Sequence, residues 1–284
     1  MRIFITGETG YISNRLYANL CLKQENYSIN KKSIRNESLN RLDFTDMDIV
    51  IHTAALVHKK ESKYSKDLYF DINVALTKEL ALKAKREKVK QFIFISTMAV
   101  FGNQEGCINS GSSIEPVTFY GQSKLVAEEA IKELEDEHFK VAIVRPPMVY
   151  GPNCPGNYTL LSKLSKKTPI FPLVENERSM IFIDNLIELI YQLIQNEESG
   201  IFHPQDPQYI NTSSMVREIS EVHGKSIYFS VFAGKVLKKL IGHKGLYQKV
   251  FSDLYYAKEL SSYKDNSYQK YNLKQAITIT EREQ

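Results

Sequence analysis

Arg2-Ile3-Phe4-Ile5-Thr6-Gly7-Glu8-Thr9-Gly10-Tyr11-Ile12-Ser13 stands at the start of this 284-residue chain. Its first five residues form a short apolar run that is typical of a buried strand. Two glycines follow at once, and residues 14–23 then carry apolar side chains at helical spacing. A strand, a glycine turn and a helix in this order predict a site where a dinucleotide pyrophosphate lies against a helix N-terminus. Two glycines alone leave an ordinary strand-to-helix turn as the alternative.

Strand-like apolar runs alternate with helical patterns along most of the chain. The runs lie at residues 2–6, 47–55, 91–97 and 140–145, and a further strand is expected within 27–34. The helical patterns lie at about residues 11–24, 70–88, 120–138, 159–167, 184–196, 212–223 and 233–242. This alternation predicts parallel strands with right-handed crossovers, and therefore an α/β protein with a Rossmann-like doubly wound parallel sheet. Only eight residues separate Asp43 from His52, so the third strand or its connection is expected to be abbreviated.

The chain is expected to divide into a dinucleotide-binding domain and a small C-terminal substrate-binding lobe. The dinucleotide-binding (Rossmann) domain is placed at residues 1–152, joined by about 180–203, and the lobe at 153–179 and 204–284. A turn-rich segment with glycine and proline, at residues 151–157, marks the exit from the first domain. Residues 233–250 are basic and amphipathic, which is typical either of a solvated helix face or of a helix at a membrane surface.

Tyr120 and Lys124 are four residues apart and share one face of a predicted helix. A lysine beside a phenol favours the phenolate, so it is expected to lower the tyrosine pKa from its ordinary value of about 10. A tyrosine tuned in this way passes a proton to or from a substrate oxygen near neutral pH. Ser96 and Thr97 add two hydroxyls where the 91–97 run ends, and the 47–55 run ends in small residues. Ligands of open α/β sheets collect at this edge.

Together these segments resemble the extended short-chain dehydrogenase/reductase family, in particular its NAD-dependent epimerase/dehydratase group, which acts on nucleotide sugars. The matching segments are Thr6-Gly7-x-x-Gly10-Tyr11-Ile12, His52-x-Ala54-Ala55, Ser96-Thr97-x-x-Val100-Phe101-Gly102, Tyr120-Gly121-x-Ser123-Lys124, Arg145-Pro146-Pro147-x-Val149-Tyr150-Gly151-Pro152 and Arg178-Ser179-Met180-Ile181-Phe182-Ile183-Asp184. The likeness runs from residue 1 to about residue 200. It implies hydride transfer at C4 of a nucleotide sugar, by analogy a UDP-hexose, by a 4-epimerase or 4-ketoreductase of polysaccharide precursor synthesis. A non-catalytic NAD(P)-binding sensor or scaffold is the alternative.

The resemblance also assigns roles to individual residues. Tyr120 exchanges a proton with the sugar oxygen, Thr97 hydrogen-bonds the same oxygen, and Lys124 holds the cofactor ribose and tunes Tyr120. The residues expected to bind the cofactor are Gly7, Thr9, Gly10, Tyr11, Ile12, Arg35, Asp43, Ala54, Ala55, Ser96, Lys124 and Pro147. The residues expected to contact the substrate are Thr97, Met98, Tyr120, Asn157 and Arg178, with Arg178 on the diphosphate. A strand-end hydroxyl bonded to its own loop is the alternative for Thr97, and a surface ion pair with Glu175 or Glu177 is the alternative for Arg178.

Two departures from the family pattern bear on the chemistry. Ser13 replaces the third glycine of the Gly-x-x-Gly-x-x-Gly pattern, where a small residue still permits close helix packing. Met98 and Ala99 stand where family members that dehydrate the sugar carry Asp-Glu. Neither side chain transfers a proton, so a 4,6-dehydratase is disfavoured.

A third departure concerns the choice between NAD and NADP. The acidic residue expected at the end of the second strand is absent, and Lys31, Lys32 and Arg35 lie in that region. Positive side chains there favour the 2′-phosphate of NADP over the ribose hydroxyl of NAD. If the strand lies a few residues elsewhere, these side chains are merely exposed and NAD stays open.

Composition limits the classes of partner. Hydrophobic residues make up 43% and charged residues 25% of the chain, as in soluble globular proteins, and the net charge of +4 is mild. No basic patch interleaved with aromatics indicates nucleic acid, and three widely spaced cysteines predict neither a disulfide framework nor a metal site. No apolar stretch reaches the ~18 residues of a membrane span, and no signal peptide is apparent, so a cytoplasmic protein is expected.

The resemblance further implies a homodimer that packs two helices from each subunit, those at 70–88 and at Tyr120. Four apolar residues of these helices lie either near that interface or against the chain's own sheet, namely Leu76, Leu80, Val126 and Ile131.

Overall fold

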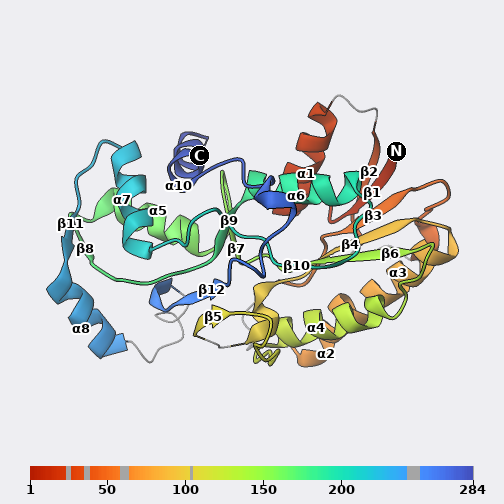
Figure 1. The fold of residues 1–284 in the computed structure, drawn as a ribbon, viewed down its shortest axis with the longest axis horizontal. Helices are drawn as coiled ribbons and strands as arrows, with labels where there is room; N and C mark the ends of the chain where they lie inside the picture. The colour runs from red at the N-terminus through yellow and green to blue at the C-terminus, as the bar shows by residue number, and fades with distance from the viewer. Residues whose placement is uncertain (24–26, 35–38, 58–63, 103–104, 242–249, 284) are drawn as a thin grey trace. The chain divides into compact units, whose positions relative to one another are not determined.

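The computed structural model describes residues 1–23, 27–34, 39–57, 64–102, 105–241 and 250–283 (Figure 1). The chain forms two compact units. Unit 1 comprises residues 1–103, 113–146 and 187–204, and unit 2 comprises residues 104–112, 147–186 and 205–284.

Unit 1 is built on a six-stranded parallel sheet with the order β10-β6-β4-β3-β1-β2. Its strands are β1 (Arg2–Thr6), β2 (Ser28–Lys32), β3 (Ile49–His52), β4 (Gln91–Ile95), β6 (Lys140–Val144) and β10 (Gly200–Phe202). The order runs outward from β1 in both directions, since β1 pairs with β2 on one side and β3 on the other. The predicted Rossmann-like, doubly wound parallel sheet is confirmed. The strand order changes direction between β1 and β3, and this is the switch point at which such sheets bind ligands.

Helices cover both faces of this sheet. Figure 1 shows α1 (Tyr11–Leu22) and α6 (Ile183–Gln195) on one face, and α3 (Leu76–Arg86) and α4 (Phe119–Lys132) on the other. The core under α3 and α4 joins sheet residues such as Phe92 and Phe94 to Leu80 and Ile131, which are fully buried. Leu80 and Ile131 therefore pack inside the chain, and their suggested place near a dimer interface is wrong. Leu76 and Val126 are only partly buried, and the homodimer stays a prediction.

The connections depart from the sequence expectation in two places. Between β2 and β3 the described chain forms only a short 3-10 turn, η1 (Leu39–Arg41), which agrees with the abbreviated third segment. The helix predicted at 70–88 begins earlier, as α2 (Lys66–Phe70), and passes through the π-helical turn η3 (Asp71–Ala75) before α3 starts. A π turn adds a residue to the helical repeat, and such turns are frequent at functional sites.

Unit 2 contains short strand pairs and a group of helices. The strands pair as β5 (Gly106–Ile108) with β12 (Leu254–Tyr256), β7 (Met148–Tyr150) with β9 (Met180–Phe182), and β8 (Ile170–Pro172) with β11 (Tyr228–Ser230). The helices are α5 (Asn157–Lys167), α7 (Thr212–Val222), α8 (Val231–Ile241) and α10 (Leu273–Arg282), with a 3-10 turn, η5 (Lys264–Asn266). Helix α10 was not predicted from the sequence. It packs against α7, which in turn packs against α5.

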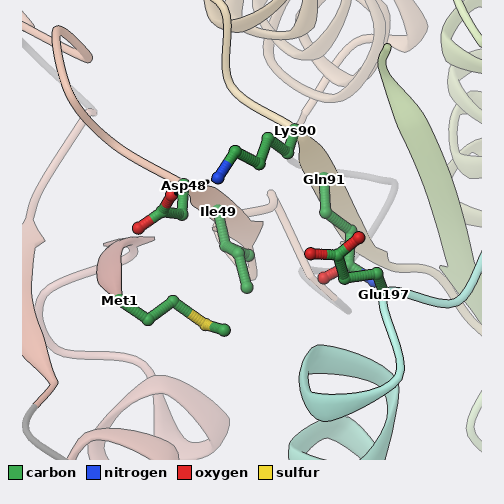
Figure 2. Close-up of a pocket in the computed structure, with 6 residues that line it drawn as sticks. All are labelled: Met1, Asp48, Ile49, Lys90, Gln91 and Glu197. Carbon is green, nitrogen blue, oxygen red and sulfur yellow. Dashed lines mark hydrogen bonds and ion pairs between the residues drawn. The ribbon is translucent and has the colours of Figure 1, made fainter. Parts of the chain in front are cut away.

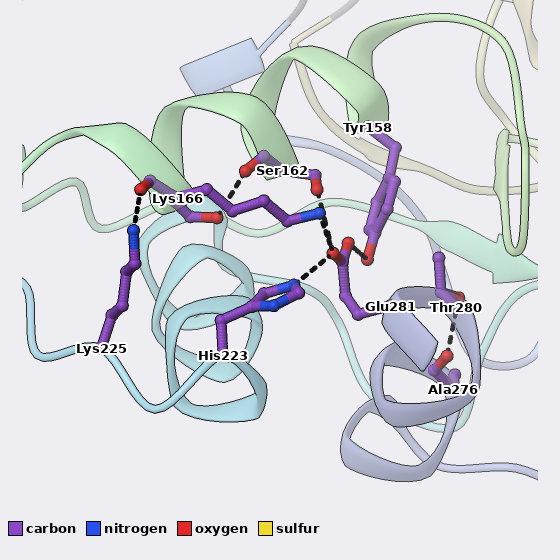
Figure 3. A network of polar contacts seen from close by, with 9 residues as sticks. Tyr158, Ser162, Lys166, His223, Lys225, Ala276, Thr280 and Glu281 are labelled. Atoms are coloured by element: carbon purple, nitrogen blue, oxygen red, sulfur yellow. Dashed lines mark hydrogen bonds and ion pairs between the residues drawn. The ribbon is translucent and has the colours of Figure 1, made fainter. Parts of the chain in front are cut away.

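A single carboxylate joins these three helices. The Glu281 side chain, on α10, is fully buried and accepts hydrogen bonds from the Tyr158 hydroxyl at 2.8 Å and the Ser162 hydroxyl at 3.0 Å, both on α5. Lys166 and His223 reach the same carboxylate, each at 2.8 Å (Figure 3). Burial raises the pKa of Glu281, but these hydrogen bonds together bring it below its ordinary value. The ionised carboxylate therefore fixes α10 to α5 and to the end of α7.

Candidate active site

The glycine turn after β1 has the geometry that the sequence predicts. Gly7 has a φ of +89°, and a Cβ there would lie 2.8 Å from the Thr53 hydroxyl oxygen, so only glycine fits without strain. Ser13 Oγ donates to the carbonyl oxygens of Gly7 and Gly10, at 2.9 Å for Gly10. The serine at the third glycine position is thus compatible with the turn and braces it from the first turn of α1.

The start of α1 suits an anion. Gly10 occupies the N-cap, no side-chain cap bond forms there, and the described first turn has no acidic residue. The N–H groups of a first helical turn and the positive end of the helix dipole attract a bound negative group. Thr9 is exposed, while Tyr11 and Ile12 are partly buried at the beginning of the helix. These residues fit the pyrophosphate of a dinucleotide.

A buried histidine holds the end of β3 in place. His52 lies between the Thr6 hydroxyl, 2.8 Å from Nδ1, and the Thr77 hydroxyl, 2.9 Å from Nε2. Thr6 Oγ1 already accepts the N–H groups of Thr53 and Ala54, so its proton is directed to Nδ1 and the Nε2–H tautomer follows. Burial lowers the pKa of His52 to about 3, so the ring is neutral. The expectation that His52 packs at a strand end rather than binding ligand agrees with this geometry.

Thr97, Tyr120 and Lys124 gather at the carboxyl end of β4 and the first turns of α4. The Tyr120 hydroxyl is hydrogen-bonded to the side chain of Thr97. Thr97 Oγ1 also accepts the Ala99 N–H at 3.1 Å, which is the loop bond named as the alternative for Thr97. The Thr97 hydroxyl can therefore bond its own loop and the Tyr120 hydroxyl at the same time. Lys124 is 1% exposed, and its amine lies 3.7 Å from the centre of the Phe94 ring.

The chain without its ligands does not lower the pKa of Tyr120 as expected. Burial raises the pKa of Tyr120 to about 12, against the opposing effect of the Thr97 hydrogen bond. Burial also lowers the pKa of Lys124 to about 7, against the attraction of Glu128. The lowered tyrosine pKa that the sequence argument expects is therefore not found in the chain without its ligands, because burial favours the neutral form of both groups.

Two predicted residues near this site, Ser96 and Met98, have distinct environments. Ser96 donates its hydroxyl proton to Glu128, on α4, so it joins the end of β4 to that helix. Glu128 is also paired with Arg145, whose Nη2 lies 2.6 Å from the carboxylate, and both side chains are almost fully buried. Met98 is 7% exposed, and its N–H donates to the Pro146 carbonyl at 2.9 Å. The cofactor contact of Ser96 and the substrate contact of Met98 stay predictions.

Sequence reasoning missed Asn73, in the π turn. Its side-chain amide makes two hydrogen bonds to the Leu56 backbone: Oδ1 accepts from the N–H at 2.7 Å, and Nδ2 donates to the carbonyl oxygen at 3.2 Å. It also donates to Ser123 Oγ at 3.0 Å, and Ser123 donates to the Tyr120 carbonyl at 2.9 Å. Asn73 thus links the loop after β3 to the turn of α4 that carries Tyr120. The available signal was the helical spacing of Asn73 from Tyr69, Leu76 and Leu80, which places a polar residue on the apolar face.

The other predicted cofactor residues are placed as follows. Ala54 and Ala55 follow β3 and are partly buried, and Pro147 is buried at the start of unit 2. Asp43 is exposed, and hydrogen bonds from Thr45 lower the pKa of its carboxyl group. Lys31 lies on β2 and donates to Asn14 Oδ1 at 2.5 Å. Arg35 lies outside the described residues.

Two predicted substrate residues belong to unit 2. Asn157 is the first residue of α5 and is partly buried. Arg178 is 9% exposed and donates from Nη1 to the Ser252 carbonyl at 2.5 Å, while burial lowers its pKa to about 10. The guanidinium is still fully charged at neutral pH. Its diphosphate contact stays a prediction.

A separate cavity lies at the opposite end of the unit 1 sheet. It has a volume of about 210 Å³ and is lined by Met1, Asp48, Ile49, Lys90, Gln91 and Glu197 (Figure 2). Asp48 accepts the Arg2 N–H at 2.8 Å and the Lys90 amine at 3.0 Å. The cavity is at the amino ends of β3 and β4, so it is not part of the site described above.

The fold and these residues define a dinucleotide-dependent enzyme of the short-chain dehydrogenase/reductase type. A model of the NAD dependent epimerase/dehydratase family matches residues 3–203, and the chain belongs to this family. The UDP-glucose 4-epimerase of Vibrio cholerae is 29% identical, with 89% of this chain and 86% of that protein covered.

Solved structures support the same fold. UDP-glucuronic acid 4-epimerase from Bacillus cereus, in complex with NAD, has a TM-score of 0.76 at 19% identity, covering 100% of this chain and 96% of its own. A dTDP-4-dehydrorhamnose reductase from Bacillus anthracis str. Ames, in complex with NADP, has a TM-score of 0.64 at 23% identity, covering 80% and 82%. The chain is an NAD(P)-dependent enzyme. Among its described helices, none is both long enough and apolar enough to span a bilayer.

Proposed function

We propose that the protein is a nucleotide-sugar 4-epimerase that acts on a UDP-hexose with a bound nicotinamide dinucleotide. The observation that carries this is the hydroxyl pair Tyr120–Thr97 with the buried Lys124 amine on the same helix as Tyr120. These groups provide proton transfer to one sugar oxygen and leave no acid–base pair for dehydration, because Met98 and Ala99 follow Thr97. The relationship to a UDP-glucose 4-epimerase over most of the chain supports the choice of sugar position and nucleotide.

Each residue has a definite task in this reaction. The dinucleotide, when bound, accepts and returns the hydride. Tyr120 takes the proton of the C4 hydroxyl as the carbon is oxidised and returns it when the carbon is reduced on its other face. Thr97 donates a hydrogen bond to the same oxygen, and Lys124 holds the dinucleotide ribose and offers its charge to the Tyr120 phenolate. Arg178 and Asn157 bind the nucleotide diphosphate and sugar.

A 4-ketoreductase is the second candidate, since β2 ends in Lys31 and Lys32. An enzyme that uses NADPH as a consumed reductant needs positive side chains for the 2′-phosphate, and the described residues that follow β2, Ser33 and Ile34, include no carboxylate that would reject it. The non-catalytic sensor or scaffold is less well supported, because such a role does not require Thr97, Tyr120 and Lys124 together.

The test is to purify the protein without added cofactor, denature it and identify any released dinucleotide by mass spectrometry. Retained NAD(H), together with interconversion of UDP-glucose and UDP-galactose, is expected for the epimerase. A protein that is empty, binds NADPH more tightly than NADH and reduces a 4-keto sugar nucleotide instead supports the reductase. A protein that binds neither dinucleotide contradicts both.

Tyr120→Phe then separates an enzyme from a scaffold. The variant is expected to keep dinucleotide binding and to lose at least about 10²-fold in turnover, because general acid–base catalysis contributes on that order. Tyr17→Phe, on a half-exposed part of α1, is the matched control and should leave turnover unchanged. Undiminished turnover in Tyr120→Phe would sink the mechanism.

A further inference from the structure

Helix α8 in unit 2 turns an apolar stripe outward. Phe232 is 77% exposed, Val236 is 38% exposed and Leu240 is 65% exposed. These residues are spaced four apart, so they lie along one face of the helix. Single exposed apolar residues are common in soluble proteins, but three large ones in register on one short helix form a surface.

The opposite side of α8 is the side that packs. A Cβ at Gly234 would lie 2.2 Å from the Leu173 carbonyl oxygen, so the glycine lets the helix approach the chain beside β8 closely. The N–H of Ala233 donates to Ser230 Oγ at 3.2 Å and fixes the start of the helix. The outward orientation of the Phe232 stripe is therefore set by packing on the other face.

The neighbouring strands extend the apolar surface. Tyr228, on β11, is 69% exposed, and its register partner Ile170, on β8, is 52% exposed. β11 leads directly into α8, whose own first residue, Val231, is 55% exposed (Figure 1). We call Tyr228, Ile170 and the Phe232, Val236 and Leu240 stripe the α8 surface.

The charge around this surface has one sign. Lys235 and Lys239 are exposed and follow the same face of α8, beside the apolar stripe. The sequence from 222 to 252 contains six lysines and neither aspartate nor glutamate. A solvated helix face, the simpler interpretation of this basic segment, would carry polar side chains where Phe232 and Leu240 stand. Apolar residues flanked by lysines instead match the boundary between acyl chains and anionic headgroups.

We propose that the α8 surface docks the enzyme reversibly on an anionic phospholipid bilayer. Phe232, Val236 and Leu240 enter the boundary between headgroups and acyl chains, and Lys235 and Lys239 stay at the level of the lipid phosphates. The helix is eleven residues long, so it lies in the plane of the interface. Binding is weak and salt-dependent, because a few lysines and a short apolar stripe act together.

The experiment is flotation of the full-length protein with vesicles of phosphatidylcholine mixed with phosphatidylglycerol, against vesicles of phosphatidylcholine alone. We expect binding to the anionic vesicles only, and its loss in high salt. Phe232→Ser with Leu240→Ser removes the apolar anchors, and Lys235→Glu with Lys239→Glu reverses the charge. Each pair is expected to weaken binding on the order of tenfold or more.

The matched control is Leu160→Ser with Leu164→Ser, which replaces an equivalent exposed pair on α5 at 45% and 41% exposure and should bind as wild type does. Equal binding by all variants, or no binding by the wild type, overturns the proposal. If the α8 surface instead joins two copies of the chain, light scattering would give a dimer mass for the wild type and a lower mass for the Phe232→Ser, Leu240→Ser variant, and the wild type would not bind vesicles. That result also overturns the proposal. Flotation needs no substrate, so its outcome is independent of the proposed reaction.

Discussion

Lys124→Met tests whether burial sets the protonation state of Lys124, the lysine proposed to act beside Tyr120. The amine is 1% exposed, and burial lowers its pKa from 10.5 to about 7. This difference corresponds to about 4–5 kcal/mol of cost for keeping the proton inside the fold, at ~1.4 kcal/mol per pKa unit. Methionine has a similar shape and no charge. We expect the free energy of unfolding of the cofactor-free variant to rise by about 2–4 kcal/mol at neutral pH, with loss of turnover.

The stability difference between Lys124→Met and the wild type should depend on pH in a definite direction. The pKa of Lys124 is lower in the folded chain than in the unfolded chain, so the unfolded chain holds the extra proton between about pH 7 and pH 10.5. The wild-type protein therefore gains stability from this group as the pH rises through that window. Because Lys124→Met lacks this gain, its advantage over the wild type should shrink as the pH rises and vanish near pH 10.5.

The assay is urea unfolding followed by circular dichroism at several pH values, with dinucleotide removed, since a ligand would stabilise the wild type selectively. Lys132→Met, at the exposed end of the same helix, is the control and should change stability by no more than about 0.5 kcal/mol. A Lys124 variant less stable than the wild type at neutral pH would refute the reasoning. So would an advantage that stays constant with pH.

Two further predictions concern the buried charges near the site and in unit 2. Glu128→Gln leaves the Arg145 guanidinium buried without its carboxylate, and the variant is expected to lose about 3–5 kcal/mol of its free energy of unfolding. Glu128→Leu with Arg145→Met removes both charges, so this double variant should unfold close to the wild-type urea midpoint. Equal losses in the two proteins would contradict this account. Glu281→Gln is expected to loosen α10, seen as faster proteolysis of the C-terminal helix. Because the pKa of Glu281 lies below 4.5 in the fold, its stabilisation is complete above that pH and lost as the pH falls through the folded value, so the melting difference should close on acidification.

The sheet of unit 1 could be predicted because its signals are local. Each central strand is a continuous apolar run, and the turn between β1 and α1 needs glycine at Gly7 for its backbone angle alone. The short strands of unit 2 have no such signal. β5 is three residues long and pairs with β12, so the pair depends on contacts between residues far apart in sequence. Helix α10 was missed for a related reason, since the buried Glu281 breaks the apolar face that a helical pattern requires.

The residues proposed to carry the chemistry were accessible from the sequence, and the residues that hold them in place were not. Thr97, Tyr120 and Lys124 stand in an order and spacing that a family pattern records. Asn73 and Glu128 lie inside helices where a polar residue predicts a solvent-facing position, yet they are 1% and 3% exposed. Each is buried because it satisfies several partners at once, and that arrangement depends on the packed fold rather than on local spacing.

The protonation states of Tyr120 and Lys124 could not be predicted from their spacing in the sequence. Four residues of separation place Tyr120 and Lys124 on one helical face, but burial then favours the neutral form of both, at pKa values of about 12 and about 7. The pH at which the phenol releases its proton therefore depends on the charge and water that a bound ligand brings to, or removes from, the site. The hydrogen bond between the Tyr120 and Thr97 side chains is already in place, so the chain sets the geometry in advance. We therefore expect the working pKa of Tyr120 to belong to the complex with its ligands, and a pH–rate profile to show a midpoint far below that of the free chain.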